Sequence, residues 1–187
     1  MDIYLIRHTQ TANSAGLCYG QSDVLVASTF EKEVDTLLGK LPEFDDDCVV
    51  FSSPLSRCVQ LAETLSDTVT PDPRLQELHF GDWEGKLFDD IEPTALQQWT
   101  DNFSTAAPPN GETFGSLYER TGEFWQELLK TEAEQVVIVT HAGVIRALLA
   151  RVLNLPLENA FQFRIDAGSV HKLRSIDDYI YLEYVNL

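Results

Sequence analysis

Three short apolar runs constrain the fold of this 187-residue chain more than any other feature of its sequence. They cover residues 3–6, 48–51 and 136–139, and their composition is typical of strands that are buried on both faces of a sheet. Apolar residues recur at helical spacing between these runs, over 55–65 and 114–129, and another helical pattern follows the third run over 144–153. This alternation predicts an α/β fold: a three-layer α/β/α sandwich with a mostly parallel central sheet and helices on both faces. Two strand-like stretches near the end of the chain, 170–173 and 179–184, could extend the sheet at one edge.

The length fits a single domain that spans residues 1–187. One segment, at about 81–111, interrupts the alternation of strands and helices. It contains Trp83, Trp99 and a Pro-Pro-Asn-Gly sequence at 108–111. Because long insertions in compact domains are often functional, we expect a helical insertion that covers the active site.

The charge of the chain excludes several kinds of partner. Thirteen basic and 30 acidic residues give a formal net charge of −17, which repels nucleic acid and anionic membranes. The uncharged apolar stretches are too short to cross a bilayer. We recognise no secretion signal, and three cysteines without Cys-x-x-Cys spacing read as reduced thiols, so the predicted location is the cytoplasm. An anionic substrate would need a local cluster of positive charge.

The residues that follow the three apolar runs supply such a cluster. Arg7 and His8 follow the first run, Arg57 lies just after the second, and His141 follows the third. Because ligands of open α/β sheets bind outside the carboxyl ends of the strands, parallel neighbours would bring these four side chains together. A helix begins after His141, and its N-terminus also favours an anion. Guanidinium groups bind phosphate oxygens through paired hydrogen bonds, so the sequence predicts a phosphate site.

These residue types are sufficient for phosphoryl transfer without a metal or another cofactor. Arg7, Arg57 and His141 would neutralise the phosphoryl oxygens, and a neutral His8 imidazole would attack phosphorus and form a phosphohistidine. The leaving oxygen needs a proton from a nearby carboxylic acid. Glu77 and Glu84 lie in one stretch of the sequence, and on position alone both are candidates.

Four motifs in this order resemble the histidine phosphatase superfamily, which is also called phosphoglycerate-mutase-like. They are Leu-Ile-Arg-His at 5–8, Ser-Ser-Pro-Leu-Ser-Arg at 52–57, Glu77 with Gly-Asp-Trp-Glu-Gly at 81–85, and Thr-His-Ala-Gly at 140–143. The resemblance implies that His8 is the phosphorylated residue and that Glu77, rather than Glu84, is the proton donor. It also implies that the catalytic set is completed by Arg7, Arg57 and His141.

The resemblance further implies substrate-binding residues in the loop after the nucleophile and at the start of the last helix, namely Asn13, Ser14, Gln21 and Ala142. The chain departs from the family pattern at two positions. Thr9 follows the nucleophile where the family usually has glycine, and Ser14 stands where the family has asparagine.

Within the superfamily, residues 16–24, 77–85 and the Pro-Asn-Gly-Glu stretch at 109–112 are most similar to the α-ribazole phosphatases. This similarity implies hydrolysis of α-ribazole 5′-phosphate, a small phosphorylated metabolite, in the assembly of the cobalamin nucleotide loop. A broad-specificity small-metabolite phosphatase and a phosphoglycerate mutase of the same fold are the alternatives. An inactive relative that only binds phosphorylated ligands is disfavoured because the catalytic set is intact. The oligomeric state, monomer or homodimer, is left open.

Overall fold

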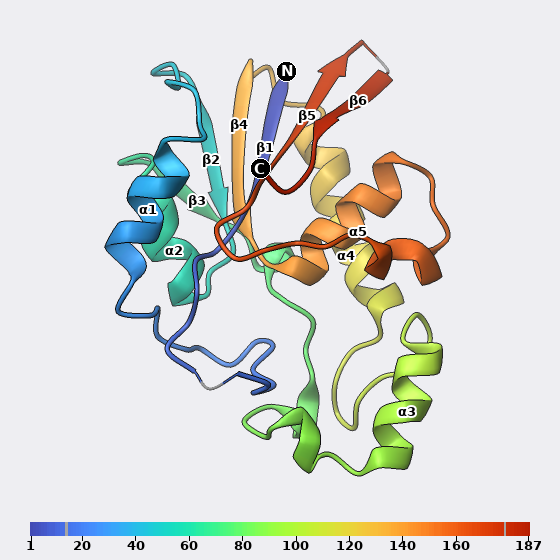
Figure 1. Ribbon diagram of the computed structural model, residues 1–187. Helices are drawn as coiled ribbons and strands as arrows, with labels where there is room; N and C mark the ends of the chain where they lie inside the picture. The colour runs from blue at the N-terminus through green and yellow to red at the C-terminus, as the bar shows by residue number, and fades with distance from the viewer. Residues whose placement is uncertain (14, 178) are drawn as a thin grey trace.

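A single six-stranded sheet forms the centre of the molecule. The computed structural model describes residues 1–13, 15–177 and 179–187, and the strand order is β3-β2-β4-β1-β5-β6 (Figure 1). The strands are β1 (Asp2–Arg7), β2 (Val49–Ser52), β3 (Val69–Pro71), β4 (Gln135–Thr140), β5 (Val170–Ile176) and β6 (Tyr179–Tyr184). Strands β1 to β4 are parallel to one another. Strand β5 is antiparallel to β1, and β6 is antiparallel to β5. The predicted, mostly parallel sheet is therefore confirmed.

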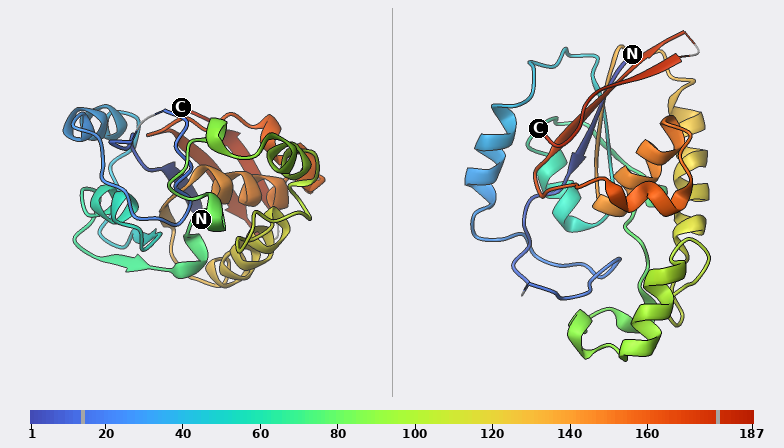
Figure 2. Two further views of the ribbon diagram at one scale, coloured as in Figure 1. Left: turned by 90° about the horizontal axis from the view of Figure 1, so that it is seen from below. Right: turned by 45° about the vertical axis from the view of Figure 1, so that its right-hand side comes forward.

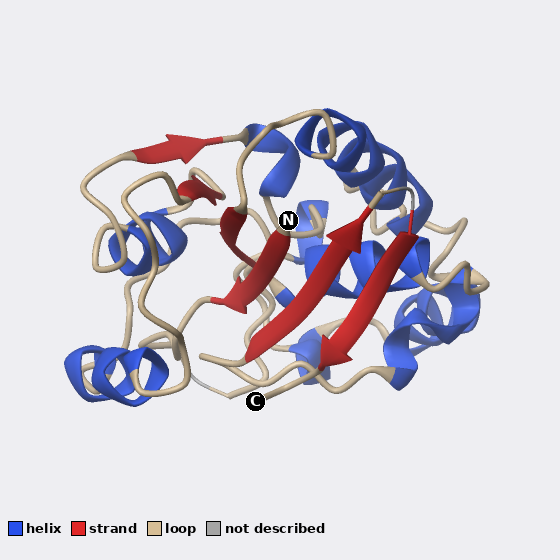
Figure 3. Ribbon diagram, turned by 90° about the horizontal axis from the view of Figure 1, so that it is seen from above, coloured by secondary structure: helices blue, strands red, loops and turns tan. Residues whose placement is uncertain are grey.

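Helices cover both faces of this sheet (Figures 2 and 3). On one side lie α1 (Phe30–Leu38) and α2 (Ser56–Ala62), and on the other lie α4 (Phe114–Leu128) and α5 (Ala142–Val152). Strand β1, in the interior of the sheet, explains this arrangement, because successive side chains of a strand point to opposite faces. Ile3 and Leu5 pack in the core with α4 and α5, and Tyr4 and Ile6 pack in the core with α1 and α2. Both faces of β1 are therefore buried under helices, which explains its continuous apolar sequence. The three predicted layers are confirmed.

The chain between β3 and α4 extends beyond the carboxyl ends of the parallel strands (Figure 1). It contains the short 3-10 helices η1 (Pro73–Leu75), η2 (Gly81–Trp83) and η3 (Phe88–Asp90), followed by α3 (Pro93–Asn102). A further 3-10 helix, η4 (Leu157–Gln162), follows α5. The segment has a small core of its own, in which Trp83 and Trp99 pack edge to face. Their ring centroids are 5.8 Å apart, and Cys18 and Ile91 belong to the same core. The two tryptophans are therefore packing residues of this segment.

A search of the described residues finds no helix that is both long and apolar enough to span a membrane.

One buried histidine of the fold lies outside the cluster predicted from the strand ends. His171 in β5 is fully buried, with its Nε2 3.0 Å from the Ser169 hydroxyl. Its Nδ1 accepts the backbone N–H of Asn186 at 3.1 Å. Burial lowers the pKa of His171 to about 4, against about 6.5 for an unfolded chain. The neutral ring is therefore part of the folded state.

We expect this histidine to make the fold sensitive to acid. Below pH 6.5 the unfolded chain binds a proton that folded His171 does not bind until about pH 4. The stabilising contribution is thus complete above pH 6.5 and is lost as the pH falls towards 4, by up to about 1.4 kcal/mol per pH unit. Urea unfolding of the wild type and of His171→Gln between pH 6 and pH 4.5 measures this effect. The variant should show a shallower loss of unfolding free energy, and equal slopes would contradict the assignment.

Candidate active site

The register of the parallel strands brings the ends of β1, β2 and β4 to one level. Arg7 lies opposite Thr140 in the β1–β4 pair, and the pairing continues past the strand ends. The backbone N–H of His8 donates to the Thr140 carbonyl at 3.0 Å, and that of Ser53 donates to the Val139 carbonyl at 2.9 Å. The three motifs of the strand ends therefore meet in space, as the sequence predicts for parallel neighbours.

His8 is held as a neutral imidazole with one free ring nitrogen. Its Nδ1 lies 2.7 Å from the carbonyl oxygen of Thr9. Because a carbonyl can only accept, Nδ1 carries the proton and Nε2 keeps its lone pair. Burial, with the positive charges of Arg57 and Arg7, lowers the pKa of His8 to about 3. Both effects favour the form of histidine that can attack phosphorus.

The second histidine lies against the first. The ring centroids of His8 and His141 are 5.2 Å apart. His141 is the N-cap residue of α5 and is fully buried, with Nε2 2.8 Å from the Ser53 hydroxyl and Nδ1 3.3 Å from a terminal nitrogen of Arg57. Burial, followed by the charges of His8 and Arg57, lowers the pKa of His141 well below its usual value. His141 is therefore also neutral near pH 7. Because Arg57 can only donate, Nδ1 of His141 accepts, and the single N–H of the ring lies on Nε2 and faces the Ser53 hydroxyl.

Two arginines are fixed beside these rings by backbone carbonyl groups. Arg57, which is fully buried, donates to the carbonyl oxygens of Gly20 at 2.7 Å and Ser22 at 3.0 Å. Arg7 donates to the carbonyl oxygen of Ile165 at 2.7 Å. Neither arginine forms an ion pair with any part of the chain that the structure describes. The site therefore keeps two positive charges without a neutralising carboxylate.

Several buried polar atoms around this point lack a hydrogen-bond partner among the described residues. They are Nε of Arg7 and of Arg57, the hydroxyl of Thr9 and the amide nitrogen of Asn13. Such groups are rare in folded proteins and call for an explanation. The atoms can all donate, and two belong to cations, so the oxygens of an anion such as phosphate match them chemically.

A cleft of about 290 Å³ is lined by three of these four residues, Arg7, Thr9 and Asn13, and by His8, whereas Arg57 lies outside its lining. This volume is at the lower end of the range for small-molecule sites. A larger hollow of about 450 Å³ is lined by acidic residues, among them Asp45, Asp47, Glu132 and Glu134. Its charge disfavours a phosphorylated ligand, so the smaller cleft is the candidate site.

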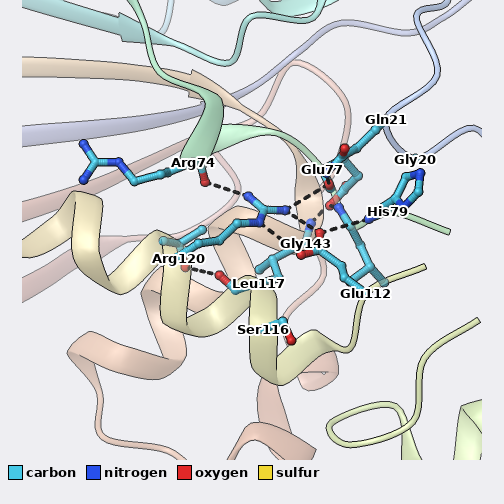
Figure 4. A network of polar contacts seen from close by, with 12 residues as sticks. Gly20, Gln21, Arg74, Glu77, His79, Glu112, Ser116, Leu117, Arg120 and Gly143 are labelled. Atoms are coloured by element: carbon cyan, nitrogen blue, oxygen red, sulfur yellow. Dashed lines mark hydrogen bonds and ion pairs between the residues drawn. The ribbon is translucent and has the colours of Figure 1, made fainter. Parts of the chain in front are cut away.

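The carboxylate of Glu77 lies at the start of α5, just after His141. It accepts the backbone N–H of Gly143 at 3.2 Å and that of Leu78 at 2.9 Å (Figure 4). A Cβ atom at position 143 would lie 2.2 Å from a carboxylate oxygen of Glu77. Glycine in this motif therefore leaves room for the acid.

Glu84, the other carboxylate that the sequence offers, is used to hold a loop. It accepts the backbone N–H groups of Gln21 at 2.9 Å, Ser22 at 2.6 Å and Phe80 at 3.0 Å, as well as the Ser22 hydroxyl. These contacts fix the loop whose carbonyl groups bind Arg57. Four hydrogen bonds therefore commit the Glu84 carboxylate to this loop.

The remaining predicted residues are placed in different ways. Asn13 lines the cleft, and Ala142 is a buried residue in the first turn of α5. The Gln21 amide nitrogen donates to the carbonyl oxygen of Glu77 at 3.0 Å, so this side chain contacts the backbone of the candidate acid. Thr9 is fully buried beside His8. Ser14 lies outside the described residues.

Two charged residues near Glu77, Arg120 and Arg146, escaped the sequence analysis, and a third, Glu112, entered it only as part of the Pro-Asn-Gly-Glu stretch at 109–112. Arg120 and Glu112 form an ion pair at 2.6 Å, and Arg120 also reaches the Glu77 backbone. Arg146, one helical turn after Gly143, donates to the Phe163 carbonyl at 3.1 Å. Burial lowers the pKa of Arg146, and the nearby charge of Glu77 offsets this effect only in part. An arginine three positions after the Thr-His-Ala-Gly motif was a visible signal, whereas nothing local in the sequence pairs positions 112 and 120 with position 77.

Fold and site together define a phosphatase of the phosphohistidine type, and comparison with known proteins agrees. The model of the histidine phosphatase superfamily (branch 1) matches residues 3–187. The chain therefore belongs to the histidine phosphatase superfamily, and the predicted family and enzyme class are confirmed.

Among its relatives, the adenosylcobalamin/α-ribazole phosphatase of Escherichia coli (strain K12) is 32% identical over 177 residues, covering 90% of this chain and 87% of the relative. The crystal structure of the α-ribazole phosphatase from Shigella flexneri superposes with a TM-score of 0.90 at 29% identity, covering 100% and 96% of the two chains. The glucosyl-3-phosphoglycerate phosphatase of Mycobacterium tuberculosis (strain ATCC 25618 / H37Rv) is 32% identical over 170 residues, covering 76% of each chain.

Proposed function

We propose that this enzyme hydrolyses α-ribazole 5′-phosphate, free or as part of a cobamide, to α-ribazole and phosphate. The observation that carries the proposed chemistry is the position of a neutral His8 with a free Nε2 between two arginines that have no carboxylate partner in the described chain. The leaving group is proposed from the similarity to α-ribazole phosphatases over almost the whole length of the chain.

In the first step, Nε2 of His8 attacks phosphorus and the bond from phosphorus to the ester oxygen breaks. Arg7 and Arg57 stabilise the charge on the three other oxygens, and His141 holds a terminal nitrogen of Arg57 through its Nδ1. Glu77, in its protonated form, gives its proton to the departing oxygen. The products of this step are the alcohol and a phosphohistidine.

In the second step, a water molecule attacks the phosphorus of the phosphohistidine. The Glu77 carboxylate, left unprotonated by the first step, takes a proton from this water. The bond between phosphorus and Nε2 breaks, and phosphate and neutral His8 are regenerated. Neither step requires a metal or another cofactor, so full activity is expected in excess EDTA.

Binding of the substrate is assigned to Asn13, which lines the cleft, and to Ala142 at the N-terminus of α5. Asn13 offers a buried amide nitrogen that has no partner in the described chain, and Ala142 lies where α5 presents its N-terminal backbone to an anion. Gln21 acts on the substrate indirectly, through the carbonyl of Glu77. A cytoplasmic location is also proposed, since all three cysteines of the chain are free.

One relative favours a second candidate. The Mycobacterium tuberculosis relative acts on glucosyl-3-phosphoglycerate, so a fold of this kind also accepts a phosphorylated sugar acid. A broader small-metabolite specificity is therefore the alternative to α-ribazole 5′-phosphate.

The substrate proposal predicts a strong preference in kcat/KM. Phosphate release would be measured in EDTA from α-ribazole 5′-phosphate, 3-phosphoglycerate, glucosyl-3-phosphoglycerate, AMP and 4-nitrophenyl phosphate. We expect α-ribazole 5′-phosphate to be preferred by about 100-fold or more, which corresponds to roughly 2.7 kcal/mol of transition-state binding. Equal, weak activity on every compound would reject the assigned leaving group and keep the chemistry.

The nucleophile assignment predicts the loss of turnover in His8→Asn, by a factor on the order of 10³ or more, because no other free imidazole nitrogen faces the phosphate. Rapid quenching in base with radiolabelled substrate should trap phosphate on the wild type and not on this variant. His171→Gln, which changes a buried histidine outside the site, is the matched control and should keep both turnover and labelling. Labelling of His8→Asn would show that another residue is the nucleophile.

The acid assignment predicts that the loss of kcat/KM in Glu77→Gln depends on the leaving group. Phenyl phosphate and 4-nitrophenyl phosphate have similar shapes, but phenol is the more basic leaving group and needs protonation more. The variant should therefore lose about 10²- to 10⁴-fold in kcat/KM for phenyl phosphate and far less for 4-nitrophenyl phosphate. An equal loss for both substrates would reject Glu77 as the acid.

A further inference from the structure

The segment that follows Glu77 is closed by a tight neck, which consists of residues 79–82 and 109–112. The backbone N–H of Glu112 donates to the His79 carbonyl at 2.9 Å, and that of Asp82 donates to the Pro109 carbonyl at 2.9 Å. Gly81 has a φ of +54°, and a Cβ atom there would lie 2.0 Å from the Pro109 carbonyl oxygen. The two sides of the neck are therefore in direct backbone contact, only a few residues from Glu77.

One ion pair attaches this neck to helix α4. Arg120 of α4 binds Glu112 through two nitrogens, Nε to Oε2 at 3.1 Å and Nη2 to Oε1 at 2.6 Å. The same Oε1 accepts the backbone N–H of His79 at 3.0 Å. The side chains of Arg120 and Glu112 are only 21% and 18% exposed, so the pair is better shielded than an ordinary surface ion pair.

The guanidinium of Arg120 also holds the backbone of Glu77 itself. Its Nη2 donates to the Glu77 carbonyl at 3.0 Å, and its Nη1 donates to the Arg74 carbonyl at 2.7 Å (Figure 4). Gln21 donates to the Glu77 carbonyl at 3.0 Å. All three nitrogens of the Arg120 guanidinium are thus bonded to the protein, which leaves this group occupied with positioning rather than with substrate.

We propose that Arg120 and Glu112 are positioning residues for the reaction, and that they act by holding the backbone of Glu77 so that its carboxyl group faces the leaving oxygen. The proposal rests on the proposed role of Glu77 as the acid. Misplacement of a catalytic group by about 1 Å can cost on the order of 100-fold in rate, and the Glu77 side chain hangs from a chain segment that has little regular secondary structure. Lysine at position 120 keeps the charge but cannot bond to two carbonyls and a carboxylate in the fork geometry of arginine.

The leaving-group ratio tests this proposal, because a purely structural role would not change it. The ratio is kcat/KM for 4-nitrophenyl phosphate divided by kcat/KM for phenyl phosphate. We expect Arg120→Lys, Arg120→Ala and Glu112→Gln to raise it, by about tenfold or more for Arg120→Ala, while activity on 4-nitrophenyl phosphate shows that the site is still folded. Glu127→Gln is the matched control. It removes a neighbouring arginine–glutamate pair, Arg74–Glu127 at 2.7 Å, whose Glu127 side chain is 63% exposed, and it should leave the ratio unchanged.

The double variant Arg120→Ala/Glu77→Gln shows whether Arg120 acts through the acid. If it does, Arg120→Ala adds no further change to the ratio once Glu77 has lost its proton. Equal losses on both substrates in Arg120→Ala, with an unchanged ratio in Arg120→Lys, would overturn the proposal. An unchanged ratio in Glu77→Gln would instead reject the acid assignment itself, so the two failures are distinguishable.

Discussion

The site depends on two arginines that are held near the protein interior without carboxylate partners. A buried charge is costly unless it is paired or hydrogen-bonded, and Arg57 is fully buried. Backbone carbonyl oxygens of Gly20, Ser22 and Ile165 take the place of a counter-ion. Because these dipoles solvate the arginines without neutralising them, the positive charge is retained for an anion. The same charge, added to burial, keeps His8 neutral and nucleophilic.

The need to solvate the buried charge of Arg57 explains how the loop at residues 20–23 is held. Residues 20–23 must present their carbonyls to Arg57, so the loop is tied down at several points. Glu84 binds its backbone N–H groups, and Asp23 accepts both the backbone N–H and the hydroxyl of Ser56 at the start of α2. The carboxylates of Glu84 and Asp23 thus both hold the loop that binds Arg57. A third carboxylate, Glu77, accepts the backbone N–H of Gly143 in the first turn of α5.

Much of this arrangement could be predicted from the sequence. The apolar runs at 3–6, 48–51 and 136–139 coincide with β1, β2 and β4, and the residues after them meet as parallel strands require. The strand β3 was not predicted, because three residues, of which two are exposed, carry no periodic pattern. Helix α1 was missed as well, since only Val34 and Leu37 of its nine residues are buried. The contact between Arg120 and Glu77 joins residues 43 positions apart through backbone carbonyls, which leave no trace in side-chain patterns.

The net charge of −17 bears on how such an enzyme selects its substrate. Long-range repulsion of a phosphorylated metabolite is screened beyond about 8 Å at physiological ionic strength, so within the cleft the local cations dominate. Guanidinium groups bind the oxygens of a phosphoryl group, which every phosphomonoester shares. Discrimination among phosphomonoesters must therefore come from short-range contacts with the leaving group. The loop that follows His8 lines the cleft, and the segment from η2 to α3 contacts this loop, where the N–H of Phe88 donates to the Gly16 carbonyl at 2.9 Å. These two elements are therefore where we expect the specificity for the leaving group to lie.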